Sequence, residues 1–359
     1  MPIAPTIDVV IAVHDPSRPV TRAVRSVLHD AVAGVRVLVV CHGIASAAFE
    51  VARAEFADAP VEWLEFSDGV PSPTGPFMHG LRSASADYVA IMGSDDFLEP
   101  GAVEASARLL EADAPDALIL PLRHQGGEML RNPLARKGRV RSLDAVRDRL
   151  AYRSAPLAFL RRGLLDELSL ELTPGLASGE DLEFSARLWF SDARVDFHPA
   201  APSYVIGADA EARVTTTPRP AEIELEAVRR LIGRDWVRAS ASAARNSLVI
   251  KLLRIHVLGA VLRRIEGAGA VPDGDLAAYG EFTRAATALA PRAMRPFARA
   301  DRRILDSLAA VPFDAGSVLA AARAHGGAGR FDQLLPRNPL LAFDREGTLR
   351  RFLRYRTWP

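Results

Sequence analysis

Two adjacent carboxylates, Asp95 and Asp96, directly follow a hydrophobic run that begins at Tyr88. In an open α/β sheet, ligands bind outside the carboxyl ends of the strands, so side chains at such a position are candidates for a binding site. Paired carboxylates suit Mg²⁺ or Mn²⁺, because these hard cations prefer oxygen ligands and bridge diphosphate oxygens. The alternative is a solvated turn before the helix that Pro100 begins. Spacing alone leaves both interpretations open.

A second acidic cluster, formed by Glu180, Asp181 and Glu183, opens an apolar helical pattern. Acidic residues in a first helical turn are expected from the helix dipole alone. The cluster gains weight beside the first one, because an acid or base facing a metal-bound diphosphate must come from a second segment of the chain. We therefore treat it as a candidate for proton transfer.

Short β-branched runs alternate with helical patterns from residue 7 to about residue 122, which predicts βαβ units and a mainly parallel sheet. The predicted strands are residues 7–13, 35–40, 61–66, 88–92 and 117–122, and the predicted helices are residues 17–29, 45–57, 76–84 and 101–113. Ser17 is expected to cap the first helix. A loop at residues 67–76 is rich in Gly, Pro and Ser, and a loop at residues 123–141 is basic. The basic loop either clamps an anionic substrate or is simply solvated.

The sequence changes character after Pro218, where Ala, Leu and Arg recur at helical spacing with few β-branched clusters. This change predicts a domain of residues 1–217 followed by a helical C-terminal region of residues 218–359. The predicted helices there are residues 221–233, 239–266, 273–290, 301–311, 316–325 and 345–355. The longest of them scatters its polar residues around the helix, which predicts internal packing and not a membrane anchor.

Composition excludes several classes of protein. The 45 Lys and Arg residues nearly balance 44 Asp and Glu residues, and the resulting net charge of +1 disfavours nonspecific nucleic-acid binding. The single cysteine, Cys41, excludes an intramolecular disulfide framework and a multi-cysteine metal site. The N-terminus lacks the features of a signal peptide, and the richest apolar stretch, residues 248–262, is too short to span a bilayer. We expect a cytoplasmic protein, with peripheral association at the inner face of a membrane left open.

The two acidic clusters, in this order and on this kind of scaffold, resemble the family 2 glycosyltransferases with the GT-A fold. The resemblance covers roughly residues 6–215. It rests on four pieces of sequence, namely Asp8-Val-Val-Ile-Ala-Val-His14-Asp15, Val37-Leu-Val-Val-Cys41-His42-Gly43, the run from His79 to Asp96, and Gly179-Glu180-Asp181. Each piece is weak alone, and the four in register are specific.

The resemblance implies a set of site residues. Asp96 looks like the metal-binding carboxylate, with Asp95 beside it as a second metal ligand or a contact to the ribose or sugar of the donor. Asp181 looks like the general base, and Glu180 is its neighbour in the acid pair. The remaining donor-binding candidates are Val13, His14, Asp15, His42 and Arg213. Arg213 contacts phosphate in this interpretation, although a plain surface arginine fits the sequence equally well.

The activity implied is inverting, metal-dependent transfer of a sugar from a nucleotide-sugar, with UDP as the nucleotide by family frequency, to a glycan or lipid-linked acceptor in cell-envelope polysaccharide biosynthesis. Three positions depart from the family pattern. Cys41-His42 stands where an acidic pair is common, Phe77-Met78 replaces Arg-Asn, and Gly93 replaces an acidic residue. A non-catalytic scaffold with this fold is therefore a second hypothesis. A nucleotidyltransferase is a third, disfavoured because no Gly-rich phosphate loop follows the first strand.

Overall fold

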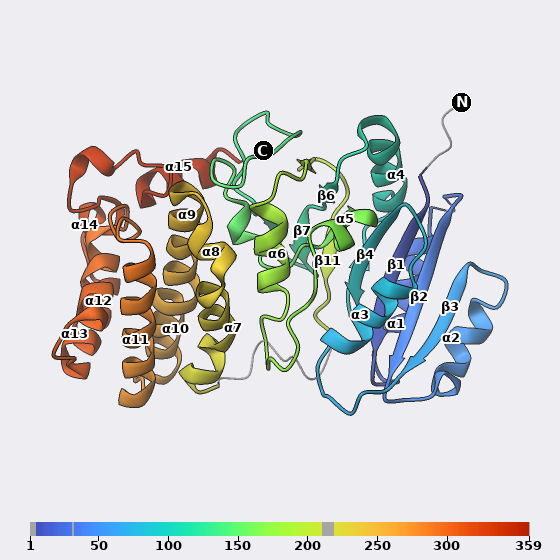
Figure 1. Cartoon of the computed structure of the whole chain (residues 1–359), viewed down its shortest axis with the longest axis horizontal. Helices are drawn as coiled ribbons and strands as arrows, with labels where there is room; N and C mark the ends of the chain where they lie inside the picture. The colour runs from blue at the N-terminus through green and yellow to red at the C-terminus, as the bar shows by residue number, and fades with distance from the viewer. Residues whose placement is uncertain (1–4, 31, 210–218, 359) are drawn as a thin grey trace.

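The computed structural model describes residues 5–30, 32–209 and 219–358 of the chain. Figure 1 shows a β-sheet flanked by helices on one side of the molecule, a layer of helices on the other, and one helix, α6 (Leu182–Trp189), between them. The fold predicted from the sequence, a mainly parallel sheet followed by a helical region, is confirmed.

The main sheet has seven strands in the order β10-β6-β9-β4-β1-β2-β3. All neighbouring pairs are parallel except those of β9, which runs antiparallel to both β4 and β6. The strands are β1 (Ile7–Val13), β2 (Val35–His42), β3 (Val61–Phe66), β4 (Tyr88–Gly93), β6 (Ala117–Ile119), β9 (Ala158–Arg161) and β10 (Val195–Phe197). The sequence predicted β1 and β3 to the residue and missed the antiparallel β9.

A second, four-stranded sheet lies against the first in the order β5-β11-β7-β8. Its strands are β5 (Phe97–Leu98), β7 (Leu122–His124), β8 (Met129–Leu130) and β11 (Tyr204–Ile206). The single strand predicted at residues 117–122 is wrong, because the chain divides there between β6 of the first sheet and β7 of the second. Pro121 separates them, and a proline cannot donate a hydrogen bond to a central strand.

The helices that cover the main sheet are α1 (Val20–Leu28), α2 (Glu50–Glu55) with the preceding 3-10 turn at Ser46–Phe49, α3 (Thr74–Ser83), α4 (Ala102–Asp113) and α5 (Gly163–Glu167). The expected cap at Ser17 is wrong. The first helix begins after Pro19, and the Ser17 backbone N–H instead donates to Oδ1 of Asp15 at 2.8 Å. A buried glycine, Gly80, lets α3 lie close to the sheet, because a Cβ there would come 3.1 Å from Cγ2 of Val40.

The C-terminal region is helical throughout its described length. Its helices are α7 (Ala221–Gly233), α8 (Asp235–Ala239), α9 (Ser242–Leu252), α10 (Gly259–Ala268), α11 (Asp273–Leu289), α12 (Arg299–Ala309), α13 (Ala315–Gly326), α14 (Arg330–Leu334) and α15 (Thr348–Arg356). The helix predicted at residues 239–266 is present as one continuous helical stretch made of α9, a π-helical turn at Leu253–Leu258 and α10, while α8 precedes it as a separate helix. The predicted internal packing is confirmed, since this segment contributes Leu248, Leu252 and Val261 to the helical core.

The two parts of the molecule share contacts. Leu182 and Ala186 of α6 belong to the same hydrophobic cluster as the helical region. At the opposite end, Trp358 returns to the sheet domain, where its indole N–H donates to the Pro133 carbonyl at 2.9 Å and its ring lies 6.2 Å from that of Phe197. Among the helices within the described ranges, none combines the length and apolar character needed to cross a membrane.

Candidate active site

Asp96 is held in place by a strand that lies more than a hundred positions further along the chain. The Tyr204 hydroxyl donates to Oδ2 of Asp96 at 2.5 Å, and the Gly207 backbone N–H donates to Oδ1 at 2.8 Å. The Tyr204 hydroxyl in turn accepts from the Gly93 N–H at 3.2 Å. Burial, with the Asp96 charge, raises the pKa of Tyr204 well above its usual value, so the phenol remains a donor. Asp96 is therefore a fixed carboxylate.

Two glycines allow this close packing. A Cβ on Gly93 would lie only 2.7 Å from Oδ2 of Asp96, and a Cβ on Gly207 would collide with the Asp95 carbonyl group. Either substitution would push the backbone away from the carboxylates. Gly93, one of the departures from the family pattern, thus has a local physical reason, because the Asp96 side chain occupies the space that a side chain at position 93 would need.

Asp95 is engaged by arginines that the sequence analysis did not single out. Its Oδ2 forms an ion pair with Nη1 of Arg18 at 2.8 Å, and its carbonyl oxygen accepts from Nη2 of Arg22. Arg22 also pairs with Asp209, which follows β11. Burial and the Arg18 charge lower the pKa of His14, so this imidazole is neutral at pH 7. Two guanidinium groups are thus close to the candidate metal carboxylates, where a diphosphate would need positive charge.

The residues present fit a divalent cation that the substrate helps to hold. Within the described ranges, no group of three or more His, Cys, Asp and Glu side chains could bind a metal alone. Mg²⁺ commonly takes one or two protein carboxylates and completes its shell with phosphate oxygens and water. Asp96, which Tyr204 and Gly207 hold in place, would supply such a carboxylate.

The end of β2 supplies a histidine that is paired with a carboxylate from the next strand. Nε2 of His42 lies 2.8 Å from Oδ1 of Asp68, and the His42 ring stacks on Phe66 with centroids 5.8 Å apart. The His42 hydrogen bond lowers the pKa of Asp68. A carboxylate from the loop after β3 therefore lies beside position 42, where the sequence has no acidic residue. The sequence predicts residues 67–76 to be a loop, but nothing in it singles out Asp68.

Two other residues at these strand ends face the core. Cys41 is fully buried, and burial raises the pKa of its thiol to about 11. Val13 is 1 % exposed, so only its backbone is available to a nucleoside. The Cys41 side chain therefore does not line a surface at this end of the strand, whereas the next side chain, that of His42, is partly exposed. Alternation along the strand explains the difference, because neighbouring residues point to opposite faces of a sheet.

Asp181 occupies a very different environment from Asp96. It is the N-cap residue of α6, yet its carboxylate makes no capping hydrogen bond to the helix. Burial raises the pKa of Asp181 to about 7, the neighbouring Glu180 charge adds to the rise, and Lys251 opposes it. Glu183 has a structural role, because its Oε2 accepts a hydrogen bond from Nε of Arg234 at 2.8 Å. In this cluster, Asp181 therefore has the raised pKa, Glu180 is its charged neighbour, and Glu183 links α6 to the helical region.

The charge that faces Asp181 comes from the helical region. Lys251 of α9 is fully buried, and its Nζ lies 3.0 Å from Nε2 of His256. Residues five apart lie on different faces of an α-helix. The π-helical turn at Leu253–Leu258, in which hydrogen bonds join residues five apart, brings the two side chains together. Burial lowers the pKa of Lys251 to about 7 and that of His256 well below its usual value, so His256 is a neutral acceptor.

The described contacts therefore form two groups. One joins His14, Arg18, His42 and Asp95 electrostatically and holds Asp96 through Tyr204. The other joins Glu180, Asp181 and Lys251. Asp15 lies in the turn after β1, beside the first group. Arg213 lies outside the described residues.

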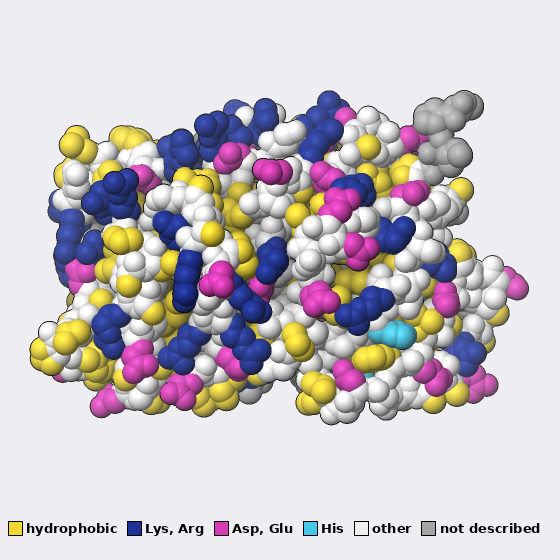
Figure 2. All heavy atoms as spheres, in the orientation of Figure 1, with side chains coloured by type: hydrophobic (Ala, Val, Ile, Leu, Met, Phe, Trp, Pro, Cys, Tyr) yellow, Lys and Arg dark blue, Asp and Glu magenta, His cyan; other side chains and the backbone are white. Residues whose placement is uncertain are grey.

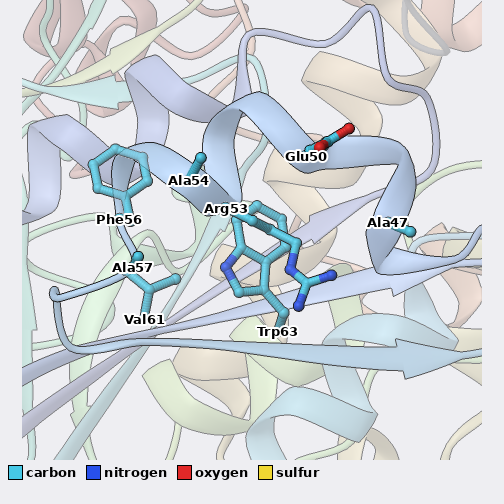
Figure 3. Close-up of a pocket in the computed structure, with 8 residues that line it drawn as sticks. All are labelled: Ala47, Glu50, Arg53, Ala54, Phe56, Ala57, Val61 and Trp63. Carbon is cyan, nitrogen blue, oxygen red and sulfur yellow. The ribbon is translucent and has the colours of Figure 1, made fainter.

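A hollow on the surface of the sheet domain belongs to neither group. It has a volume of about 740 Å³ and lies between α2 and β3. Figure 3 shows the Trp63 ring beside the Arg53 side chain, with Glu50 and Ala47 along the helix above. Only Glu50 and Arg53 bring charged groups to this surface, and no set of polar side chains converges in it. We therefore place the chemistry at the strand ends and not here.

Comparison with known proteins agrees with this geometry. Residues 8–169 match the family described as glycosyl transferase family 2. The fold is similar to that of S. aureus TarS 1–349 in complex with UDP-GlcNAc, at 13% identity and a TM-score of 0.75, with 90% of this chain and 92% of TarS 1–349 covered. TarS 1–349 in complex with UDP gives a TM-score of 0.70 at 14% identity, covering 90% of this chain and 93% of that one. No curated protein sequence matches the chain.

Proposed function

Because residues 8–169 form a glycosyl transferase family 2 domain, we propose that this glycosyltransferase moves a sugar from a UDP-linked donor to an acceptor hydroxyl with inversion of the anomeric centre. The observation that carries the proposal is the contrast between a fixed carboxylate, Asp96, and a carboxylate with a raised pKa, Asp181. Inverting transfer needs one group to organise the diphosphate and another to accept a proton. Support for UDP comes from the similar fold of TarS in complexes with UDP and UDP-GlcNAc.

In the proposed step, the acceptor oxygen attacks the anomeric carbon as the bond from that carbon to the diphosphate oxygen breaks. The bonding electron pair leaves with the diphosphate, and the acceptor proton passes to Asp181. A pKa of about 7 suits this role, because a general base is most effective when its pKa lies near the working pH. No covalent intermediate is required.

The proposed metal is Mg²⁺ or Mn²⁺, held by Asp96 and, through its neighbouring position, Asp95. When bound, it would neutralise charge on the departing diphosphate. The chain's own residues bring further positive charge to the same place, since Arg18 is paired with Asp95 and Arg22 donates to its carbonyl. His42, oriented by Asp68, would hydrogen-bond the nucleoside base through its other ring nitrogen.

The acceptor is proposed on family grounds alone to be a hydroxyl of a glycan or a lipid-linked molecule in cell-envelope polysaccharide biosynthesis. Action in the cytoplasm or at the inner face of the membrane stays a prediction of the sequence. In this proposal, Asp68 would take the place of the carboxylate that positions 41 and 42 lack, which disfavours the scaffold hypothesis. The departure at Phe77-Met78 remains in its favour.

A screen of nucleotide-sugar hydrolysis tests the proposal. The purified chain is incubated with UDP-, GDP- and dTDP-sugars, with Mn²⁺ or with a chelator, and the release of nucleoside diphosphate is measured. We expect release from a UDP-sugar in the presence of metal and loss of that release in the Asp181→Asn variant. If the chain neither bound any nucleotide-sugar nor released nucleoside diphosphate from one, the scaffold hypothesis would be favoured instead.

A further inference from the structure

A small cavity away from the active site is lined by arginine side chains alone. Its volume is about 150 Å³. This space, called the arginine cavity below, is lined by Arg136, Arg147, Arg149, Arg345, Arg350 and Arg354. They come from the loop after β8, the turn before the 3-10 helix Leu150–Tyr152, and the C-terminal segment that ends in α15. Figure 2 shows Lys and Arg side chains gathered along the upper edge of the molecule, where Figure 1 places α15 and the C-terminus.

Among the described residues, only one of the six lining arginines forms an ion pair. Arg136 forms a two-pronged ion pair with Asp148, with Nε to Oδ1 at 2.8 Å and Nη2 to Oδ2 at 2.7 Å. No ion pair of the described residues includes any of the other five lining arginines. Arginine stays protonated in proteins, so these five groups remain cations that repel one another. Such an arrangement is stabilised by a bound anion.

Arg149 lies at the buried side of the cavity and has an unused donor. Its side chain is 1 % exposed, and its guanidinium group donates to the carbonyls of Leu134, at 3.5 Å, and Arg345. Its buried Nε has no hydrogen-bond partner. Burial lowers the pKa of Arg149 to about 10, the Glu346 charge opposes this, and Arg351 and Arg354 add to it. A buried N–H without an acceptor is unfavourable, so Arg149 is held in the cavity wall at a cost that a nearby anion would offset.

We propose that the arginine cavity is a binding site for a phosphate group. The cavity volume of about 150 Å³ is large enough to admit a phosphate group. The planar guanidinium fork pairs with phosphate oxygens through two parallel hydrogen bonds, and several forks can share one tetrahedral anion. The inference is independent of the proposed sugar transfer, because it concerns a separate surface.

The phosphate has two candidate sources, a soluble phosphate ester and the headgroup of an anionic lipid. The C-terminal segment beside the cavity exposes large apolar side chains, Phe343 at 67%, Phe352 at 44% and Tyr355 at 50%. Such side chains next to basic ones are typical of surfaces that lie on anionic membranes. The arginine cavity could therefore bind the phosphate group of either source, and the second experiment below distinguishes the two.

Binding of inorganic phosphate tests the site directly. Titration calorimetry is carried out without metal at constant ionic strength, with phosphate replacing chloride, on the wild-type chain and two double variants. Arg147→Gln with Arg345→Gln removes two exposed lining residues, while Arg139→Gln with Arg356→Gln removes two exposed arginines outside the cavity. We expect saturable binding that weakens about tenfold or more in the lining variant and changes less than twofold in the control. Equal loss in both variants, or no saturable binding to the wild-type chain, overturns the proposal.

Sedimentation with vesicles identifies the source. Phosphatidylglycerol vesicles are compared with phosphatidylcholine vesicles for the same three proteins. Selective binding to the anionic vesicles that is lost only in the lining variant assigns the site to a lipid headgroup. Phosphate binding without vesicle binding assigns it to a soluble ester. Anionic-vesicle binding that is retained by the lining variant, in a chain that does not bind inorganic phosphate, contradicts the site.

Discussion

The two acidic pairs of this chain, Asp95-Asp96 and Glu180-Asp181, are close to identical in composition and opposite in environment. Asp96 accepts hydrogen bonds from Tyr204 and Gly207, and Asp95 pairs with Arg18. Asp181 makes no capping hydrogen bond, and burial raises its pKa to about 7. Donors that surround a carboxylate favour its charged form, whereas burial without donors disfavours it. The first pair is thus held in place by donors and a cation, whereas Asp181 of the second pair is suited to exchanging a proton.

The elements that surround each pair produce this difference. The first pair lies where two small strands, β5 and β11, meet the end of β4, so the Gly207 N–H and the Tyr204 hydroxyl both donate to Asp96. The second pair sits where α6 meets the helical region, whose buried side chains are mostly apolar. Among the described residues, only Lys251 brings a charge of opposite sign to Asp181 there. The helical region therefore contributes to the chemistry of the base as well as to packing.

The largest expected effect is that of removing the proton acceptor. Asp181→Asn keeps the shape of the side chain but cannot take the acceptor proton, so we expect turnover to fall on the order of 100- to 10,000-fold. The affinity for UDP, measured by titration, should be unchanged, because the substitution affects only the chemical step. Glu180→Gln is the matched control and should retain most activity. Wild-type turnover in Asp181→Asn would transfer the role of base to Glu180 or another group.

Asp96→Ala is expected to act on the other half of the comparison. It removes the proposed metal ligand, and the affinity for UDP measured with Mn²⁺ should fall about 100-fold, toward the value measured with a chelator. The fold should persist, as judged by circular dichroism, because Asp96 contributes ligand oxygens more than packing. Asp58→Ala, in an exposed turn, controls for the loss of a carboxylate. Unchanged metal-dependent affinity would show that Asp96 is not the ligand.

The sequence identified both acidic pairs but not their environments. Asp95 and Asp96 could be found because they follow a hydrophobic run, and strand ends bind ligands whatever the family. Their partners could not, because Tyr204 and Gly207 are more than a hundred positions away and carry no local signal. Asp68 was missed for a related reason, since a carboxylate in a loop rich in Gly, Pro and Ser reads as a turn residue.

The main sheet was predictable because buried parallel strands are continuous β-branched runs, as in β1 and β3. The π-helical turn was not, since the predicted helix of residues 239–266 has good helical spacing throughout. An insertion of one residue into a helix changes which side chains meet, and here it pairs Lys251 with His256. Hydrophobic periodicity reports the buried face of a helix but not such a local change in its winding.

Lys251→Met should shift the pKa of the base, Asp181, and leave the base itself in place. Lys251 is buried, and its positive charge opposes the rise in the pKa of Asp181 caused by burial and by Glu180. Loss of that charge, with His256 neutral beside it, should raise the pKa of Asp181 further. The base must be deprotonated to accept a proton, so the activity of the wild-type chain should fall below about pH 7. This acidic limb of the pH profile should move upward by about one pH unit in the variant.

The pH dependence of kcat provides the measurement, because a purely structural role of Lys251 would lower kcat at every pH without moving the limb. Lys137→Met is the matched control, since Lys137 is the other lysine of the chain and is exposed. A variant whose limb stays at the wild-type pH would show that Lys251 does not act on the proton acceptor. The fixed pair should be insensitive to this change, so UDP affinity is expected to stay the same.

The smallest expected effect concerns the end of the donor crevice, where the comparison is between two adjacent residues of one strand. His42 is paired with Asp68 and partly exposed, whereas Cys41 is fully buried in the core. His42→Ala should therefore weaken UDP binding by about three- to tenfold, the value of one hydrogen bond between uncharged groups, while Cys41→Ser should leave affinity unchanged and lower stability. Competition among UDP, GDP and dTDP for the metal-loaded chain measures both effects. A clear preference for GDP would contradict the uridine assignment and leave the sugar transfer itself intact, because Asp96 and Asp181 act on the diphosphate and the acceptor and not on the base.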